Sequence, residues 1–464
     1  MPDPSTVISK VLPFCVPSDS EEQGIEKTAQ EAKALVEEYV ARLEDVSEVV
    51  FGGSFAKGTW LPHHADIDIF VKIKTSVGLN KFEEMGRGIG SEALKKYGPR
   101  LRYSDHPYVE AFVNKVRVNV VPCYDVEQGE WKSAADRSPF HTQYINSHFD
   151  GKKRKQTRLL KKFFKSAGIY GAEISTEGFS GYVSEVLVVK YCSFENILRA
   201  AADDWQQRQI IAVHDYNLDL VKTFSSPLII IDPVDSRRNL GTAISPESVA
   251  KFILASRAFI EHPSVEFFNG GGGGGGEEAD KKNHLPSSGK LLVSNLLVVE
   301  FSHQKKSPDI IWGQLKRSVN SIAKQLELAD FEVLRFSCVT DERNSAVLVF
   351  LLEAINLPPY TTKKGPEIFR RNDAAAFLSK RKTKPLAIWV DGEMRVTMLI
   401  ERKVTDARKF IKSLLINEHG KNGISKDLIV NKIQIYSAGD KKIIKGLAKE
   451  AIGEIVSTQY LIFR

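Results

Sequence analysis

The sequence has no apolar stretch long enough to cross a membrane, and its cysteines are few and scattered. Segments such as LLVSNLLVVEF and PLIII have the length of buried strands, whereas a membrane helix needs about 18 or more apolar residues. The N-terminal segment MPDPSTVISKVLPF lacks the charged and long apolar regions of a signal peptide. The four cysteines, Cys15, Cys123, Cys192 and Cys338, show neither metal-ligand spacing nor disulfide density. We therefore expect a cytoplasmic protein without a membrane partner.

Length and composition indicate a globular protein of several domains. The chain has 464 residues, of which 42% are hydrophobic and 27% charged, and a prior of about 150 residues per domain suggests three units. The formal net charge is +7, and the segment GKKRKQTRLLKKFFK, residues 151–165, holds eight Lys or Arg. Its apolar residues recur at helical spacing, which predicts a helix with one buried stripe and a basic outer face. That face is either an ordinary solvated surface or a binding surface for phosphates.

Hydrophobic periodicity predicts an α+β chain with a mainly helical middle. It predicts an amphipathic helix over 21–43, strands at EVVFGG, DIDIFVKI and VRVNVVPCY, and a helix at SFAKGTWL with Ser54 as its N-cap. Residues 151–262 are mainly helical in pattern, with PLIIIDPVD as an extended interruption. Seven consecutive glycines, 270–276, predict a flexible linker or loop tip. Beyond them, strand and helix patterns alternate as in an α+β domain.

Two aspartates stand one residue apart in the apolar strand of FGGSFAKGTWLPHHADIDIFV. Alternate strand residues share a face, so Asp66 and Asp68 should project together, with Cα atoms about 6.6 Å apart at ~3.3 Å per residue. Two carboxylates facing one space repel each other unless a cation lies between them, and Mg²⁺ prefers such oxygen ligands. Two-metal sites for phosphoryl transfer are built in this way. A solvated strand end is the alternative interpretation.

The turn Gly52-Gly53-Ser54 lies eleven residues ahead of this pair. Backbone N–H groups at a helix start can hold a triphosphate, helped by the helix dipole. Strand, glycine turn, helix and Asp-x-Asp in this order resemble the signature of the nucleotidyltransferase superfamily, which includes polymerase β, poly(A) polymerases and CCA-adding enzymes.

Further segments make the resemblance more specific. GSFAKGTWL and DIDIF are followed in order by HPYVEAF, VNVVPCY, DRSPFH, RLLKKFFKSAGIYGAE, GFSGYVSEVLV and DPVDSRRNL. Together they are similar to the archaeal, class I, CCA-adding tRNA nucleotidyltransferases, and FLSKRKTKP extends a weaker similarity into the C-terminal part. The resemblance covers most of the chain.

The resemblance implies an α+β, multidomain fold. A polymerase β-like nucleotidyltransferase head with a mixed sheet would span 1–145, and a helical neck with nucleotide and tRNA contacts 146–265. A flexible Gly-rich linker would span 266–286, and a C-terminal α+β tRNA-binding body and tail 287–464. The implied activity is template-independent addition of C, C and A to the tRNA 3′ end, with CTP and ATP as substrates, Mg²⁺ as cofactor and pyrophosphate as product. A homodimer is also implied.

The resemblance also implies a role for each matching residue. Asp66 and Asp68 would be the catalytic residues and would ligate Mg²⁺. The residues implied in nucleotide binding are Gly53, Ser54, Lys57, His141, Lys161, Tyr170, Arg238 and Asn239. Lys57 stands where the family usually has Arg, which keeps the charge but loses the bidentate fork. In the basic helix, Lys152, Lys153 and Arg154 would bind RNA. Each has an ordinary alternative, such as a core tyrosine, a turn histidine or a solvated lysine.

One position departs from the family pattern. The family's third carboxylate lies where this chain reads VRVNVVPCY, with Asn119. Asn can offer a carbonyl oxygen to a metal, but it has no negative charge and cannot act as a general base at neutral pH. Three functions therefore compete. The first is CCA addition; the second is a related nucleotidyltransferase with another RNA acceptor; the third is an RNA-binding protein with weakened catalysis.

Overall fold

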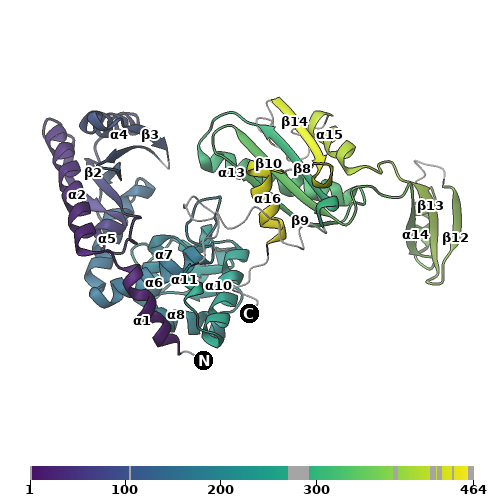
Figure 1. Ribbon diagram of the computed structural model, residues 1–464, viewed down its shortest axis with the longest axis horizontal. Coiled ribbons are helices and arrows are strands. Elements are labelled where there is room, and N and C mark those ends of the chain that lie inside the picture. The colour runs from purple at the N-terminus through teal and green to yellow at the C-terminus, as the bar shows by residue number, and fades with distance from the viewer. Residues whose placement is uncertain are drawn as a thin grey trace. The chain divides into compact units, whose positions relative to one another are not determined.

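The computed structural model describes residues 3–103, 106–269, 292–379, 385–417, 425, 431–441 and 444–457 (Figure 1). The chain forms two compact units, Met1–Asp280 with Gln459–Arg464, and Lys281–Thr458. Residues 270–286 of the predicted linker at 266–286, which include its glycine run, lie outside the described residues. The four-part division of the chain therefore stays a prediction.

The first unit begins with a five-stranded mixed sheet. Its strands are β1 (Val46–Gly52), β2 (Asp66–Lys74), β3 (Arg100–Tyr103), β4 (Pro107–Val113) and β5 (Val116–Asp125). They lie in the order β1-β2-β5-β4-β3. The neighbours β2 and β5 are parallel, and the other pairs are antiparallel. The predicted mixed sheet is confirmed.

One face of this sheet is apolar and is covered by helices. Helices α2 (Asp19–Val40) and α4 (Leu79–Ala93) pack against it (Figure 1). Ile67, Ile69 and Val71 of β2 are buried in the same cluster as residues of both helices. Because strand side chains alternate, Asp66 and Asp68 project from the opposite face. Burial of the isoleucines thus fixes the direction of the acidic pair.

The helix predicted after the glycine turn is shorter than expected. Helix α3 spans only Gly53–Ala56, and its N-cap is Gly52. The prediction of Ser54 as the N-cap is wrong, because the cap lies two residues earlier, at Gly52, and Gly53 after it has a left-handed φ of 66°. Ser54 instead lies inside the first turn of α3 and is half-buried.

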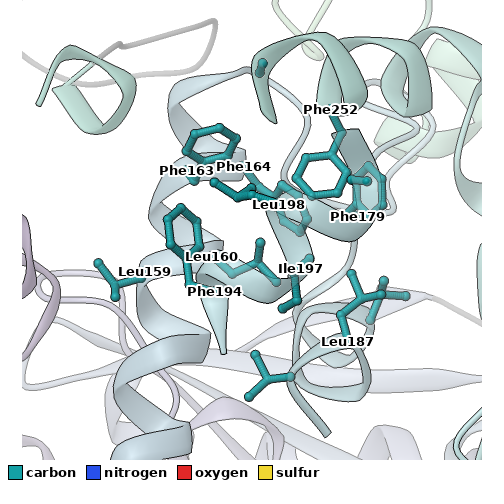
Figure 2. Packing of buried hydrophobic residues seen from close by; sticks show 14 of the residues in the cluster. Leu159, Leu160, Phe163, Phe164, Phe179, Leu187, Phe194, Ile197, Leu198 and Phe252 are labelled. Carbon is teal, nitrogen blue, oxygen red and sulfur yellow. The ribbon is translucent and has the colours of Figure 1, made fainter. Parts of the chain in front are cut away.

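The rest of the first unit is mainly helical and surrounds a cluster of aromatic rings. Its longer helices are α1 (Pro4–Cys15), α5 (Arg137–His148), α6 (Gly151–Ser166), α7 (Gly181–Tyr191), α8 (Phe194–Arg199) and α10 (Pro246–Glu261). Phe163 and Phe164 of α6 meet Phe179, Phe194 and Phe252 at ring-centroid distances between 4.5 and 6.4 Å (Figure 2). These rings hold α6 against α8 and α10.

Short elements complete this unit. They are α9 (Leu218–Thr223), α11 (Glu266–Asn269), the parallel pair β6 (Gln209–Ile211) and β7 (Leu228–Ile230), and the helical turns η1 (Lys95–Tyr97), η2 (Ala134–Asp136), η3 (Ala200–Asp204) and η4 (Leu240–Ala243). Helix α1 packs on α6, and its buried residues join the aromatic cluster.

The basic helix α6 forms where it was predicted, but its cations do not all face outward. The predicted apolar stripe is buried at Leu159, Leu160, Phe163 and Phe164. Arg158 and Lys161 are buried as well, at 6% and 1% exposure. Arg158 Nε donates to Trp60 O at 3.0 Å, and Lys161 Nζ donates to Thr59 O at 3.1 Å. The predicted basic outer face is wrong at these two residues, because backbone oxygens of the loop before β2 accept their bonds.

The second unit contains a four-stranded antiparallel sheet in the order β14-β8-β10-β9. Its elements are β8 (Leu296–Ser302), α13 (Pro308–Leu328), β9 (Val333–Thr340), β10 (Ser345–Leu352), α15 (Ala407–Asn417), β14 (Asn431–Ser437), α16 (Gly446–Val456), η5 (Val293–Asn295) and η6 (Ala438–Asp440). Helices α13 and α15 share one apolar cluster with the sheet, and α16 shares another. The sheet is therefore covered on both faces.

A small three-stranded sheet also belongs to this unit. Its strands β11 (Tyr360–Glu367), β13 (Arg395–Glu401) and β12 (Ala387–Val390) are antiparallel neighbours, and α14 (Arg371–Ser379) packs on β11. The predicted α+β character of the C-terminal part is confirmed. Within the described ranges, no helix has the length and apolarity that a membrane span requires.

Candidate active site

Asp66 and Asp68 face two hydrogen-bond donors on the neighbouring strand. The parallel register sets Asp66 beside Arg117 and Asp68 beside Asn119. Arg117 Nε donates to Asp66 Oδ1 at 2.8 Å, and its Nη2 donates to Asp66 Oδ2. Asn119 Nδ2 donates to Asp68 Oδ1 at 2.9 Å. Both aspartates therefore have a partner within the protein.

The glycine turn lies against Asp68. In the β1–β2 register Gly52 pairs with Asp68, and a Cβ at Gly53 would overlap Asp68 Oδ2. The positive φ of Gly53 also disfavours any side chain. Burial raises the pKa of Asp68, while the bond from Asn119 acts in the opposite direction. Two features therefore require glycine at this position, the positive φ and the lack of space for a Cβ beside Asp68.

A buried carboxylate holds both lysines of the predicted nucleotide site. Glu185 of α7 has no exposed surface, and Lys57 and Lys161 are 6% and 1% exposed. Lys57 Nζ lies 2.5 Å from Glu185 Oε2, and Lys161 Nζ lies 3.2 Å from Oε1. Thr59 Oγ1 also donates to Oε1, at 2.5 Å. Burial alone would raise the pKa of Glu185, but the two ammonium groups hold it below its usual value. We call these residues the Glu185 cluster; two cations and one anion leave it positive.

Tyr170 lies at the edge of the Glu185 cluster. A Cβ at Gly181, the first residue of α7, would lie 3.2 Å from Tyr170 Oη and 3.5 Å from Lys161 Nζ. The two polar groups therefore flank the same glycine. Burial raises the pKa of Tyr170, so its hydroxyl keeps its proton and remains a donor.

His141 and Arg238 meet at a second buried carboxylate, Asp232. His141 Nε2 lies 2.9 Å from Asp232 Oδ2, and Arg238 Nη1 lies 3.5 Å from the same oxygen. Tyr182 donates its hydroxyl to Asp232 Oδ1 at 3.2 Å, and its ring stacks on His141 at 3.9 Å. Lys57 Nζ lies 5.2 Å from the centre of the Tyr182 ring. This Asp232 cluster therefore adjoins the Glu185 cluster.

The charge states within the Asp232 cluster follow from burial. Burial lowers the pKa of His141, although the Asp232 carboxylate acts in the opposite direction. Burial alone would raise the pKa of Asp232, but the bond from His141 and the charge of Arg238 hold it below its usual value. The lowered pKa values of His141 and Asp232 both fit a neutral imidazole that donates to an ionised carboxylate.

Asn239 is occupied within its own loop. Its Oδ1 accepts from the backbone N–H groups of Ile230 and Gly241, at 2.9 and 2.8 Å. Its Nδ2 donates to Ser226 Oγ at 3.0 Å. Asn239 thus caps η4 next to Arg238, and its contact with an incoming base stays a prediction.

The predicted RNA-binding residues differ in exposure. Lys152, in the first turn of α6, and Lys155, in the second, are exposed. Lys153 Nζ donates to His148 O at 2.9 Å, and Arg154 Nε donates to Lys57 O at 3.0 Å. Arg154 therefore connects the basic helix to the Glu185 cluster, while Lys152 and Lys155 present their charge to solvent.

Comparison with known proteins identifies the family. A nucleotidyltransferase domain matches residues 33–145, the second domain of tRNA nucleotidyltransferases matches 155–269, and the C-terminal domain of CCA-adding enzymes matches 293–438. A CCA-adding enzyme of Saccharolobus shibatae is 34% identical over 444 residues, which are 95% of this chain and 98% of the relative. The chain belongs to the CCA-adding enzyme family.

A second curated relative agrees with this membership. A CCA-adding enzyme of Pyrobaculum islandicum is 34% identical over 415 residues, covering 88% of this chain and 93% of the relative. A solved cytoplasmic RNA terminal U-transferase is 14% identical, with a TM-score of 0.44, over 55% of this chain and 93% of that chain. The likeness to this solved structure is too distant to inform the chemistry. The predicted nucleotidyltransferase fold and the predicted family are therefore confirmed for this chain.

Nucleotidyltransferases of this superfamily generally depend on a divalent metal, and the acidic pair is the candidate site for such a cation. Among the residues that the structure describes, no group of three or more His, Cys, Asp or Glu side chains could hold a metal ion. Arg117 engages both oxygens of Asp66, and Asn119 turns a donor toward Asp68. The carboxylates of Asp66 and Asp68 are the oxygen ligands that a hard divalent cation prefers.

Several residues of the site were not predicted from the sequence. Tyr182, Glu185 and Asp232 lie inside GFSGYVSEVLV and DPVDSRRNL, segments that resemble the CCA-adding family. Glu185 is the one charged residue of its segment, and a single charge within an apolar helix could have indicated it. Arg117 and Asn119 repeat the spacing of Asp66 and Asp68, and that match could have indicated a facing pair.

Removing the buried carboxylate should destabilise the first unit. Glu185→Ala leaves Lys57 and Lys161 buried without their anion, and breaking a buried ion pair typically costs ~3–5 kcal/mol. We expect that loss in the free energy of unfolding measured with urea. The matched control is Glu195→Ala on α8, whose exposed pair with Arg199 should contribute about 0.5 kcal/mol or less. Equal losses in the two variants would show that the Glu185 cluster does not hold these elements together.

The lowered pKa of His141 predicts a dependence of stability on pH. Its pKa in the folded protein lies below the ordinary value of about 6.5. At a pH between the folded and the unfolded pKa, unfolding is therefore accompanied by the uptake of a proton. The free energy of unfolding should therefore fall as the pH drops below about 6.5, by at most ~1.4 kcal/mol per pH unit for one proton. His141→Gln should remove this contribution, and His148→Gln, exposed on the same helix, should retain it. Identical slopes for the wild type and His141→Gln between pH 7.5 and 5 would contradict the expectation.

Proposed function

We propose that the protein adds C, C and A to the 3′ end of tRNA, with CTP and ATP as substrates and pyrophosphate as product. The observation that best supports this function is similarity to CCA-adding enzymes over 95% of the chain. The contact of the Gly53 turn with Asp68, and the positive Glu185 cluster close by, agree with a site for a nucleoside triphosphate.

In this proposal the triphosphate binds the backbone N–H groups at Gly53 and Ser54, near Lys57 and Lys161. A positive cluster in a dry setting attracts phosphate more strongly than exposed lysines do. Tyr170 offers a hydroxyl donor beside Lys161. The base lies near the Asp232 cluster, where Arg238 is half exposed and can turn its remaining N–H groups toward a ligand.

The transfer itself exchanges one phosphoester bond for another. The 3′ oxygen of the RNA attacks the α-phosphorus, the bond from that phosphorus to the β-phosphate bridge breaks, and pyrophosphate leaves. The hydroxyl proton passes to water, because Asn119 has no basic group to receive it. Charge that develops on the leaving pyrophosphate is stabilised by the positive charges of Lys57 and Lys161, whose positions are fixed in advance by Glu185.

Asp66 and Asp68 would hold the divalent cation, and we propose Mg²⁺. When bound, such a cation supplies neutralisation of phosphate charge and acidification of the attacking hydroxyl. On the basis of the family resemblance we also propose a cytoplasmic location, a homodimer, and the division into a head, a neck, a linker and a C-terminal body with a tail.

An incorporation assay tests the proposed activity. The protein is incubated with Mg²⁺, labelled CTP and ATP, and a tRNA that ends at the discriminator base. We expect a product three nucleotides longer that ends in CCA. Asp68→Ala should abolish it, whereas Asp219→Ala, at an exposed position of α9, should leave it unchanged. Long A tails would indicate another nucleotidyltransferase activity, and tRNA binding without incorporation would indicate a non-catalytic RNA-binding protein.

Binding of tRNA should weaken with salt because the basic helix neutralises phosphates. Each neutralised phosphate contributes ~0.7–0.9 to the log–log slope of affinity against salt. Lys152→Glu with Lys155→Glu should lower the slope by about that amount for each lost contact. Arg154 is left intact, since it holds Lys57 O. Lys222→Glu on α9, an exposed position, is the control. An unchanged slope in the double variant would count against α6 as an RNA surface.

A further inference from the structure

Strand β5 presents donors where a metal site needs acceptors. Its residues Arg117 and Asn119 stand in register with Asp66 and Asp68 on the same face of the sheet. The guanidinium of Arg117 binds Asp66 through two parallel N–H···O bonds, the strongest geometry for such a pair. Arg117 also lies in the field of Asp68 and of Glu110 on β4. It thus occupies a position surrounded by carboxylates, as a bound cation would.

The charge of the site is consistent with this position. Asp66 and Asp68 carry two negative charges, and Arg117 cancels one of them. One divalent cation then leaves the three side chains and the cation with a single positive charge, which the bound triphosphate can balance. The pair of cations in a two-metal site lies only ~3.5–4 Å apart and needs carboxylate oxygens for both, whereas Arg117 and Asn119 already donate to three of the four oxygens of Asp66 and Asp68.

The two oxygens of Asp68 have different surroundings. Asn119 Nδ2 donates to Oδ1, while Oδ2 faces the Gly53 turn. Neither Arg117 nor Asn119 bonds Oδ2. This oxygen therefore has no donor from β5, and it lies next to the turn where the triphosphate is proposed to bind.

We propose that the Arg117 guanidinium is a built-in counter-ion that replaces one of the two cations of a two-metal site, so that the protein binds a single divalent cation at Asp66 and Asp68. Arg117 acts through Asp66 and is a positioning residue. The inference rests on the proposed function, because it takes this site as the centre of nucleotidyl transfer. Its test counts cations and needs no RNA.

The test is a titration of the full chain with Mn²⁺ in the presence of CTP, with the protein in excess over CTP, followed by electron paramagnetic resonance. Two Mn²⁺ ions ~3.5–4 Å apart give an exchange-coupled spectrum, and one ion gives an uncoupled spectrum. We expect one Mn²⁺ per CTP-bound chain, without coupling. Two coupled ions in the wild-type protein would overturn the proposal.

Variants assign the effect to Arg117. Asn119→Asp alone should still bind one ion, because Arg117 continues to occupy Asp66. Arg117→Leu combined with Asn119→Asp should bind two coupled ions. Arg87→Leu, which removes an exposed Arg–Glu pair on α4, should bind one. Two ions in Asn119→Asp alone, or one ion in the double variant, would show that Arg117 is not the replacement.

The outcomes separate this inference from the proposed function. One ion per chain together with no CCA incorporation would contradict the proposed function and support the inference. Two coupled ions together with normal CCA incorporation would support the proposed function and overturn the inference.

Discussion

The buried carboxylate of Glu185 is the interaction on which the rest of the site depends. An ionised carboxylate without access to water is stable only when cations and donors surround it, and Lys57, Lys161 and Thr59 provide them. These partners come from the loop before β2 and from α6, while Glu185 itself belongs to α7. Charge pairing therefore fixes the mixed sheet relative to the helices in the first unit, in addition to apolar packing. Because the lysines are held before any ligand arrives, little reorganisation is needed when a phosphate binds.

The orientation of the acidic pair has a different origin. Ile67 and Ile69 are buried under α2 and α4, and alternation along β2 then directs Asp66 and Asp68 to the other face. The left-handed turn at Gly53 lies against Asp68 on that face without a side chain in between. Apolar burial on one side and a glycine on the other thus position the catalytic candidates, although neither feature contacts a substrate.

Local patterns predicted the elements well and their long-range partners poorly. The spacing of apolar residues predicted β2, α2 and α6 from the sequence, because that spacing depends only on which face is buried. Ser54 was misassigned as a cap, since the sequence does not show that Gly53 adopts a left-handed conformation. The periodicity alone placed Arg158 and Lys161 on the exposed face of the helix, because the backbone oxygens that accept their bonds are far away in the chain.

The residues that complete the site show the same limit. Glu185 lies 128 residues from Lys57, and Asp232 lies 91 residues from His141. No local period connects such pairs, so family resemblance indicated His141 and Lys161 but not the carboxylates that hold them. The register of β2 against β5 was also needed before Arg117 and Asn119 could be matched to the acidic pair.

Counting charge over these groups gives a reason for the arrangement as a whole. The cations Lys57, Lys161 and Arg117 balance the anions Glu185, Asp66 and Asp68, so these six side chains are neutral together. A nucleoside triphosphate is a polyanion, and with Arg117 engaged at Asp66, one divalent cation cannot neutralise it alone. The remaining charge must be met by groups around this centre. Arg238 at the Asp232 cluster and the exposed lysines of α6 are cations in this unit that can provide it. The basic helix, Arg117 and the departure at Asn119 are thus parts of one charge balance.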